Sequence, residues 1–176
     1  GKLADYADCP EYVFADARTN FDMPYRWAGV DVEPRLKEFK PLGGNRFALT
    51  YEWIVNARLD EDYHCFVHFT NEKTTSGNAD IAFQGDHAPP KPTSQWQPGE
   101  RIVDGPYEVA VPDGPLTQFD INIGLYKQHR VSLKGPNAGG QRILLGALDV
   151  TREGEKATSV RLADTAERMR QLTATA

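Results

Sequence analysis

Residues 49–69 read LTYEWIVNARLDEDYHCFVHF, and two runs in this region alternate apolar with other residues. The first run places on one face Phe47, Leu49, Tyr51, Trp53, Val55 and Ala57. The second run places on one face Tyr63, Cys65, Val67 and Phe69. A period of two is typical of strands with one buried face. The short polar break at 59–62 suits an antiparallel turn, so this stretch predicts two β-strands joined by a turn.

The same pattern recurs along the chain, separated by turns that contain Gly, Pro and Asn. Further strands are predicted at 30–40, 79–84, 101–104, 107–111, 119–126, 130–133 and 142–150. About seven to nine short strands with regular turn signals indicate an antiparallel sandwich rather than alternating strands and helices. We therefore predict an all-β domain at 29–150, an antiparallel β-sandwich that is immunoglobulin-like or jelly-roll-like.

Two segments flank this domain. Residues 1–28 predict an irregular N-terminal arm or a junction with a preceding domain, and residues 151–176 a C-terminal tail with a short helix. The helix is expected near 161–172, where good helix formers place Leu162, Ala166 and Met169 on one face. Trp27, in the arm, fits either an exposed aromatic platform or a cover for a sheet edge.

Composition narrows the class of partner. The chain has 176 residues and a net charge of −5, with no basic cluster, which argues against a nucleic-acid partner. No apolar run approaches the roughly 20 residues of a membrane span. Because the sequence starts at Gly1 without a signal peptide, we expect a fragment whose native start is missing. Cys65 is expected in the core, and a Cys9–Cys65 disulfide remains open.

Residues 85–100 form the least regular segment, with four prolines and two glycines that exclude a regular element. A loop of this length is usually functional or fixed by its own side chains. Two interpretations of Trp96 remain open. Its indole could stack on a sugar ring, or it could fold back and plug the end of the sandwich.

The histidines raise the question of a metal. His64 and His68 lie on one predicted strand, about 13 Å apart at roughly 3.3 Å per residue, too far to share one zinc ion. His68, Asp86 and His87 could form a metal site, or a His–Asp hydrogen bond could fix the loop. Calcium is a further alternative, with candidate ligands Asp80, Asp86 and Asp104. No calcium-loop motif supports it, so we expect no resident cofactor.

Catalytic motifs are not found. A glycosidase needs two facing carboxylates, and nothing in the sequence pairs any two of Glu52, Glu100, Asp104 and Asp120. Asp86, His87 and Ser94 are close in sequence, but the Gly-x-Ser-x-Gly turn that presents a nucleophile is absent. No glycine-rich nucleotide loop follows a strand. The sequence therefore predicts a protein that is not an enzyme.

Several motifs together resemble a known kind of domain. They are Val67-His68-Phe69, the Asp- and Pro-rich residues 86–92, the Trp-x-Pro-Gly-Glu turn at 96–100, Gly124-Leu125-Tyr126 and Arg130. Over roughly 35–150 the chain is similar to β-sandwich accessory domains appended to membrane glycosyltransferases and to secreted carbohydrate-active enzymes. The resemblance implies a non-catalytic module in an extracellular or periplasmic, sugar-processing setting.

The leading hypothesis is a carbohydrate-binding accessory module whose partner is a polysaccharide or oligosaccharide. Its expected binding residues are Trp96, Tyr126, Asp86, His87 and Arg130. Aromatic faces would stack on sugar rings, and Asp, His and Arg would hydrogen-bond hydroxyls or an acidic sugar. The alternative is a structural domain that docks on a catalytic domain of the parent chain. A weaker alternative is a small hydrolase or lyase on a sandwich scaffold.

Overall fold

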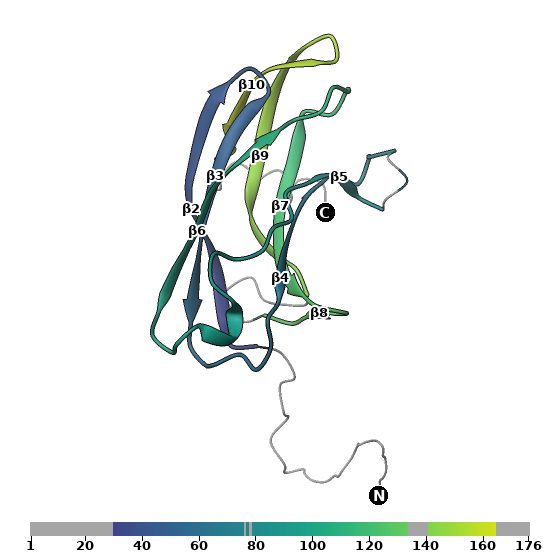
Figure 1. Cartoon of the computed structure of the whole chain (residues 1–176). Coiled ribbons are helices and arrows are strands. Elements are labelled where there is room, and N and C mark those ends of the chain that lie inside the picture. The colour runs from purple at the N-terminus through teal and green to yellow at the C-terminus, as the bar shows by residue number, and fades with distance from the viewer. Residues whose placement is uncertain (1–29, 76, 78, 134–140, 165–176) are drawn as a thin grey trace, which may run out of the picture.

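The chain folds into two antiparallel β-sheets packed face to face (Figure 1). This computed structural model describes residues 30–75, 77, 79–133 and 141–164. In these residues the only helical element is a 3₁₀ turn at Thr93–Gln95. The predicted all-β class with antiparallel, packed sheets is confirmed.

The larger sheet has the strand order β10-β9-β7-β4-β5, and β8 also pairs with β7. Its strands are β4 (His64–Thr70), β5 (Ile81–Gln84), β7 (Gln118–Tyr126), β8 (Arg130–Val131), β9 (Ile143–Glu153) and β10 (Lys156–Leu162). The smaller sheet has the order β2-β3-β6. Its strands are β2 (Val32–Gly43), β3 (Arg46–Val55) and β6 (Arg101–Ala110).

The core lies between β3 and β4, whose inner faces are the alternating apolar residues of the sequence. On β3 the side chains of Phe47, Leu49, Tyr51, Trp53 and Val55 are at most 1% exposed. On β4 those of Cys65, Val67 and Phe69 are fully buried. The prediction of which face of each strand is buried is confirmed.

The predicted turn between these strands is wrong in one respect. β3 and β4 do not pair, because they lie in different sheets, and the connection at 56–63 crosses from one sheet to the other. Leu59 in that connection is 2% exposed and covers this end of the core. Two strands with apolar inner faces can pack across a sandwich as readily as side by side.

The end of the domain also differs from the prediction. β9 continues past Val150 to Glu153, and the following β10 pairs with it, so the sheet extends beyond the predicted boundary at 150. Arg161 and Leu162, expected to begin a helix, lie in β10. Pairing with β9 overrides the helix propensity there. The remainder of the predicted helix and the arm at 1–28, including Cys9 and Trp27, lie outside the described residues.

A bulge in β6 has consequences for the interior. Leu49 pairs with Tyr107 and Tyr51 with Asp104, so Gly105 and Pro106 together face only Thr50 on β3. Gly105 has a φ of +137°, and a Cβ there would lie 2.8 Å from the carbonyl oxygen of Leu49. The extra residue turns both Asp104 and Tyr107 toward the interior, although positions three apart on a regular strand point to opposite faces.

Candidate functional site

The expected binding residues are divided between two faces of the larger sheet. His87 points into the interior, where its Nε2 lies 2.7 Å from Asp104 Oδ2. Its neighbour Asp86 accepts a hydrogen bond from the backbone N–H of Val67. Its Oδ1 also lies 3.9 Å from Nε2 of His68, on the outer face. Successive residues of an extended segment point to opposite sides, so Asp86 and His87 cannot share one ligand.

Trp96 is a plug. It is fully buried, lies 5.8 Å from Trp53 between ring centroids, and donates its Nε1–H to the carbonyl oxygen of Lys91 at 3.0 Å. This placement corrects the expectation that Trp96 binds a ligand, because a buried indole cannot stack on a sugar ring from solution. It agrees with the other interpretation of the sequence, in which Trp96 folds back and plugs the end of the sandwich.

The loop around Trp96 is held by its own side chains. The Thr93 hydroxyl donates to the carbonyl oxygen of Glu61 at 2.6 Å and accepts from the backbone N–H of Tyr63 at 2.9 Å. Asp62 accepts from the backbone N–H of Ser94, and hydrogen bonding to Ser94 lowers the pKa of Asp62. The proline-rich loop therefore ties the 3₁₀ turn to the connection between β3 and β4.

Tyr126 and Arg130 lie on the outer face of the larger sheet and flank Phe66. The guanidinium carbon of Arg130 lies 4.6 Å from the centroid of the Phe66 ring. Tyr126 lies 5.7 Å from His64 and 6.3 Å from Phe66 between centroids. This face therefore brings together two of the five expected binding residues, with Asp86 further along the same face.

His68, beyond Phe66 on the outer face, has an unsatisfied nitrogen. The residue is 5% exposed, its ring packs against Phe66 at 4.5 Å between centroids, and its Nδ1 has no hydrogen-bond partner. Burial lowers the pKa of His68 against an opposing effect of Asp86, so the ring is neutral at neutral pH. The separation of 3.9 Å from Asp86 is too long for a hydrogen bond.

The calcium candidates do not form one site. Asp80 pairs with Arg142 through two contacts of 2.8 and 3.2 Å, and hydrogen bonding to that guanidinium lowers the pKa of Asp80. Asp86 faces Val67 and His68, whereas Asp104 lies in the interior. Calcium through these three carboxylates would need them on one side of the sheet.

The interior contains a cluster of polar residues that we call the Asp104 cluster: Trp53, Cys65, His87, Asp104 and Tyr107. Asp104 is fully buried and comes from β6, and its carboxylate accepts from Tyr107 OH at 2.6 Å and from Trp53 Nε1 at 3.0 Å. His87 is held against Cys65 by a backbone bridge beyond the end of β5, and its ring stacks on Tyr107 at 4.0 Å between centroids. The cluster thus links the two sheets.

Cys65, His87 and Asp104 have one ligand atom each within 4.8 Å of one another. A thiol, an imidazole and a carboxylate also make up a nucleophilic triad, but here the imidazole faces the carboxylate and a backbone carbonyl. Burial and the carboxylates of Asp104 and Asp86 raise the pKa of the Cys65 thiol. The thiol is fully buried and has no base directed at it, so this arrangement does not activate a nucleophile.

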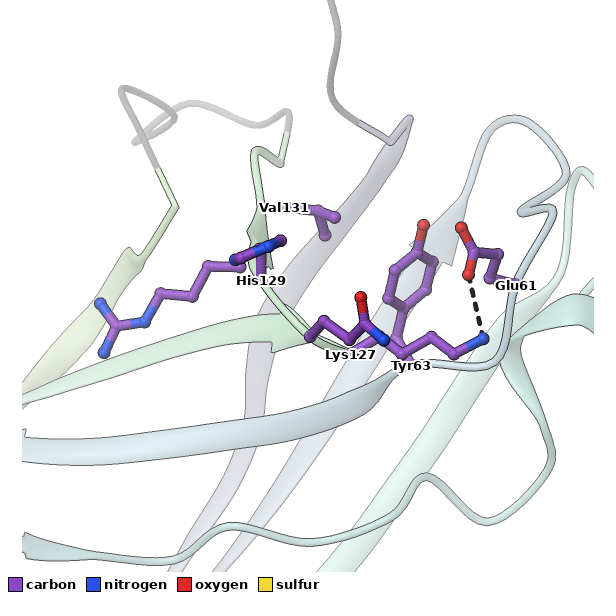
Figure 2. A pocket seen from close by; sticks show the side chains of 7 residues that line it. Glu61, Tyr63, Lys127, His129 and Val131 are labelled. Atoms are coloured by element: carbon purple, nitrogen blue, oxygen red, sulfur yellow. Dashed lines mark hydrogen bonds and ion pairs between the residues drawn. The ribbon is translucent and has the colours of Figure 1, made fainter.

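A pocket of about 260 Å³ opens at the end of the sandwich near the β7–β8 turn. We call it the Tyr63 pocket; its lining residues are Glu61, Tyr63, Lys127, Gln128, His129, Arg130 and Val131. Figure 2 shows the Tyr63 ring standing between Glu61 on one side and His129 and Val131 on the other. Lys127 Nζ pairs with Glu61 Oε1 at 3.0 Å and joins the two loops.

The Tyr63 pocket contains both hydrogen-bond donors and hydrogen-bond acceptors. Burial, with the carboxylates of Glu61 and Asp60, raises the pKa of Tyr63, so the phenol keeps its proton. Hydrogen bonding to Glu61 raises the pKa of Lys127, which stays an ammonium. The pocket therefore combines a half-buried aromatic face with an exposed charged pair, the amide of Gln128 and the imidazole of His129.

Of the expected binding residues, only Arg130 lines this pocket. The sequence analysis did not single out the other residues that line it as binding residues. The acidic break at 60–62 and the bend at 127–129 were both visible in the sequence. What the sequence did not indicate was that these two turns meet at one end of the sandwich, because their contact depends on strand order.

Comparisons of the chain with protein-family models, with curated proteins and with solved structures found no significant match. Within the described ranges, no helix has the length and apolar composition needed to cross a membrane.

Proposed function

We propose that this chain is a non-catalytic carbohydrate-binding module and that the Tyr63 pocket is its binding site. The observation that carries the proposal is the half-buried ring of Tyr63 beside the Glu61–Lys127 pair. Sugar rings present apolar faces that stack on aromatic rings, and hydroxyls that both donate and accept hydrogen bonds. In this proposal, Tyr63 supplies the face, and Glu61 and Gln128 bind the hydroxyls.

The size of the pocket sets the extent of the ligand. At about 260 Å³ it is smaller than the roughly 300–1,000 Å³ of sites that enclose a drug-sized molecule. It therefore fits one sugar unit, either a chain end or one unit of a longer glycan that continues over the surface. The extracellular or periplasmic setting implied by the resemblance belongs to the same proposal.

The docking alternative is supported less well. A domain that packs permanently on a catalytic partner needs a contiguous apolar surface. Among the residues that the structure describes, the exposed large apolar side chains are Val103 and Leu162, at 49% and 38%. They lie on β6 and β10, in different sheets, and so do not form one patch.

Affinity electrophoresis against a panel of soluble polysaccharides tests the proposal. Wild type should be retarded by one glycan class, and Tyr63→Ala should weaken binding about tenfold, which corresponds to roughly 1.4 kcal/mol. Tyr126→Ala is the matched control, because Tyr126 is also half-buried but lies outside the pocket. Both variants should retain the wild-type circular dichroism spectrum.

Two outcomes would contradict the proposal. If no glycan retards the folded wild-type protein, the chain is not a carbohydrate-binding module of the kind proposed. If Tyr126→Ala loses binding while Tyr63→Ala keeps it, the ligand binds on the outer face around Phe66, and the pocket assignment is wrong.

A further inference from the structure

Both ring nitrogens of His87 and the carboxylate of Asp104 have contacts in the Asp104 cluster. His87 Nδ1 lies 3.1 Å from the carbonyl oxygen of Gly85, an acceptor, so Nδ1 carries a hydrogen. Asp104 already accepts from Tyr107 and Trp53, as an ionised carboxylate does. In a neutral imidazole, Nε2 then presents a lone pair to Asp104 Oδ2 at 2.7 Å. A contact of this length is a hydrogen bond with the hydrogen on one of the two atoms, and a metal ion bound to both atoms would take the place of that hydrogen.

Cys65 supplies a third donor atom. Its Sγ lies within 4.8 Å of the ligand atoms of His87 and Asp104, and its one hydrogen bond is a 3.8 Å contact with the carbonyl oxygen of Phe66. A bound divalent cation removes the proton of a coordinating thiol, so Cys65 can supply a thiolate ligand. The thiol is therefore placed as a ligand that gains a bond only when a metal is present.

We propose that Cys65 Sγ, His87 Nε2 and the Asp104 carboxylate bind a divalent transition metal, with Zn²⁺ the best fit. Thiolate, imidazole and carboxylate are the three ligand types that zinc takes in proteins. A thiolate and a carboxylate together neutralise a divalent ion, which removes the cost of burying its charge. This proposal is independent of the Tyr63 pocket.

The surroundings match those of a metal site. Ligating histidines donate their second ring N–H to a carbonyl or carboxylate, as His87 does to Gly85, and ligating carboxylates are themselves hydrogen-bonded, as Asp104 is by Trp53 and Tyr107. Around a tetrahedral zinc the donor atoms lie about 3.3–3.6 Å apart, from bond lengths of roughly 2.0–2.3 Å. The 2.7 Å contact would open and Sγ would move inward. Because the three ligands lie between the sheets, the metal enters as the chain folds.

The test begins with wild-type protein that is refolded from urea with Zn²⁺, with Co²⁺ or with EDTA, and then freed of unbound metal. Mass spectrometry of the metal content should find about one zinc per chain. The cobalt form should show a thiolate-to-cobalt charge-transfer band, which reports a cysteine ligand directly. The zinc form should unfold at a higher urea concentration than the EDTA form.

Variants then assign the ligands. Cys65→Ala should abolish the charge-transfer band, and His87→Gln, which can still hydrogen-bond Asp104, should abolish metal retention. His64→Gln is the matched control, because His64 lies exposed on the same strand as Cys65 and should retain the metal.

The proposal is overturned if wild type refolded with Zn²⁺ and Co²⁺ retains no metal and shows no band. The contact between His87 and Asp104 is then a buried hydrogen bond only. It is also overturned if Cys65→Ala binds cobalt with an unchanged spectrum. The wild-type measurements decide the question even if a variant fails to fold.

Discussion

The two faces of strand β4 differ in how completely their buried polar side chains are hydrogen-bonded. On the inner face, Cys65 and Val67 pack in a core where Asp104 has a hydrogen-bond donor on each oxygen. On the outer face, Phe66 lies under the guanidinium of Arg130, and Nδ1 of His68 has no partner. Both faces are nearly free of solvent here, and Thr70 on the outer face accepts a hydrogen bond from Asn122 Nδ2 at 3.0 Å, so the outer face differs in the single nitrogen of His68. Among the described residues, the two faces therefore differ in this one unpartnered buried atom rather than in their burial.

The largest effect is expected from Asp104→Ala on the inner face. The substitution leaves the donors of Trp53, His87 and Tyr107 without their buried acceptor, and breaking a buried charged pair typically costs about 3–5 kcal/mol. Urea unfolding in EDTA measures the loss. Asp113→Ala, at an exposed turn position, is the control and should change stability by less than about 0.5 kcal/mol. Equal effects of the two substitutions would mean that the buried hydrogen bonds of Asp104 do not stabilise the fold.

The next effect tests the packing of the outer face. A Cβ on Gly124 would overlap the ring of Phe66 and lie 2.6 Å from the carbonyl oxygen of Gln141. Gly124→Ala should therefore destabilise the protein by about 1–3 kcal/mol, as overpacking does. Gly146→Ala is the matched control on β9, because a Cβ there would make an ordinary 3.8 Å contact with Leu162. Thermal unfolding compares the two, and a harmless Gly124→Ala would mean that Phe66 is free to move.

His68→Leu should have a small effect on stability, and it should stabilise the protein rather than destabilise it. Replacing a buried group that lacks a hydrogen bond by an apolar one of similar size can be neutral or stabilising. Stability at pH 7 should therefore change by less than about 1 kcal/mol. Because folding lowers the pKa of His68 from 6.5, wild type loses stability as the pH falls below that value, where the unfolded state takes up the proton.

The variant lacks this loss, so its advantage over wild type should grow between pH 7 and pH 5. Urea midpoints at the two pH values measure it. A variant that is several kcal/mol less stable than wild type would show instead that His68 does have a polar partner.

The smallest effect concerns the Asp80–Arg142 pair at the rim of the outer face. The pKa of Asp80 is lowered from 3.8, so the pair stabilises the fold above that value and the contribution is lost as the pH falls through the folded pKa. Both side chains are about a third exposed, and solvent limits the contribution to below about 1 kcal/mol. Asp80→Asn should be slightly less stable than wild type at pH 6, and the difference should be smaller at pH 2. A variant as stable as wild type at both values would mean that the pair contributes nothing.

The sequence was sufficient for the strands before residue 150 and for the buried faces of β3 and β4, because alternation records burial directly. It was not sufficient to place β3 and β4 in different sheets, since an apolar face is compatible with a neighbour beside it or opposite it. Leu162 shows the same limit: its helix-forming surroundings favoured a helix, and pairing with β9 places it in a strand.

The interior cluster was harder still to predict. The sequence analysis offered a His–Asp hydrogen bond that involves Asp86 as one alternative, but the partner of His87 is Asp104. That partner depends on the bulge at Gly105 and Pro106, which turns Asp104 and Tyr107 to the same side. The sequence did predict an interruption at 105–106, between strands at 101–104 and 107–111, but not that one strand continues through it as a bulge.

β10 also has a consequence for how this domain is made. It pairs with β9 and also contacts β2, one of the first strands of the domain, where the two sheets approach each other. During synthesis, β2 leaves the ribosome long before β10 does. The sandwich cannot close at this side until β10 has emerged, so the domain should complete its folding late, with β2 exposed to chaperones in the meantime.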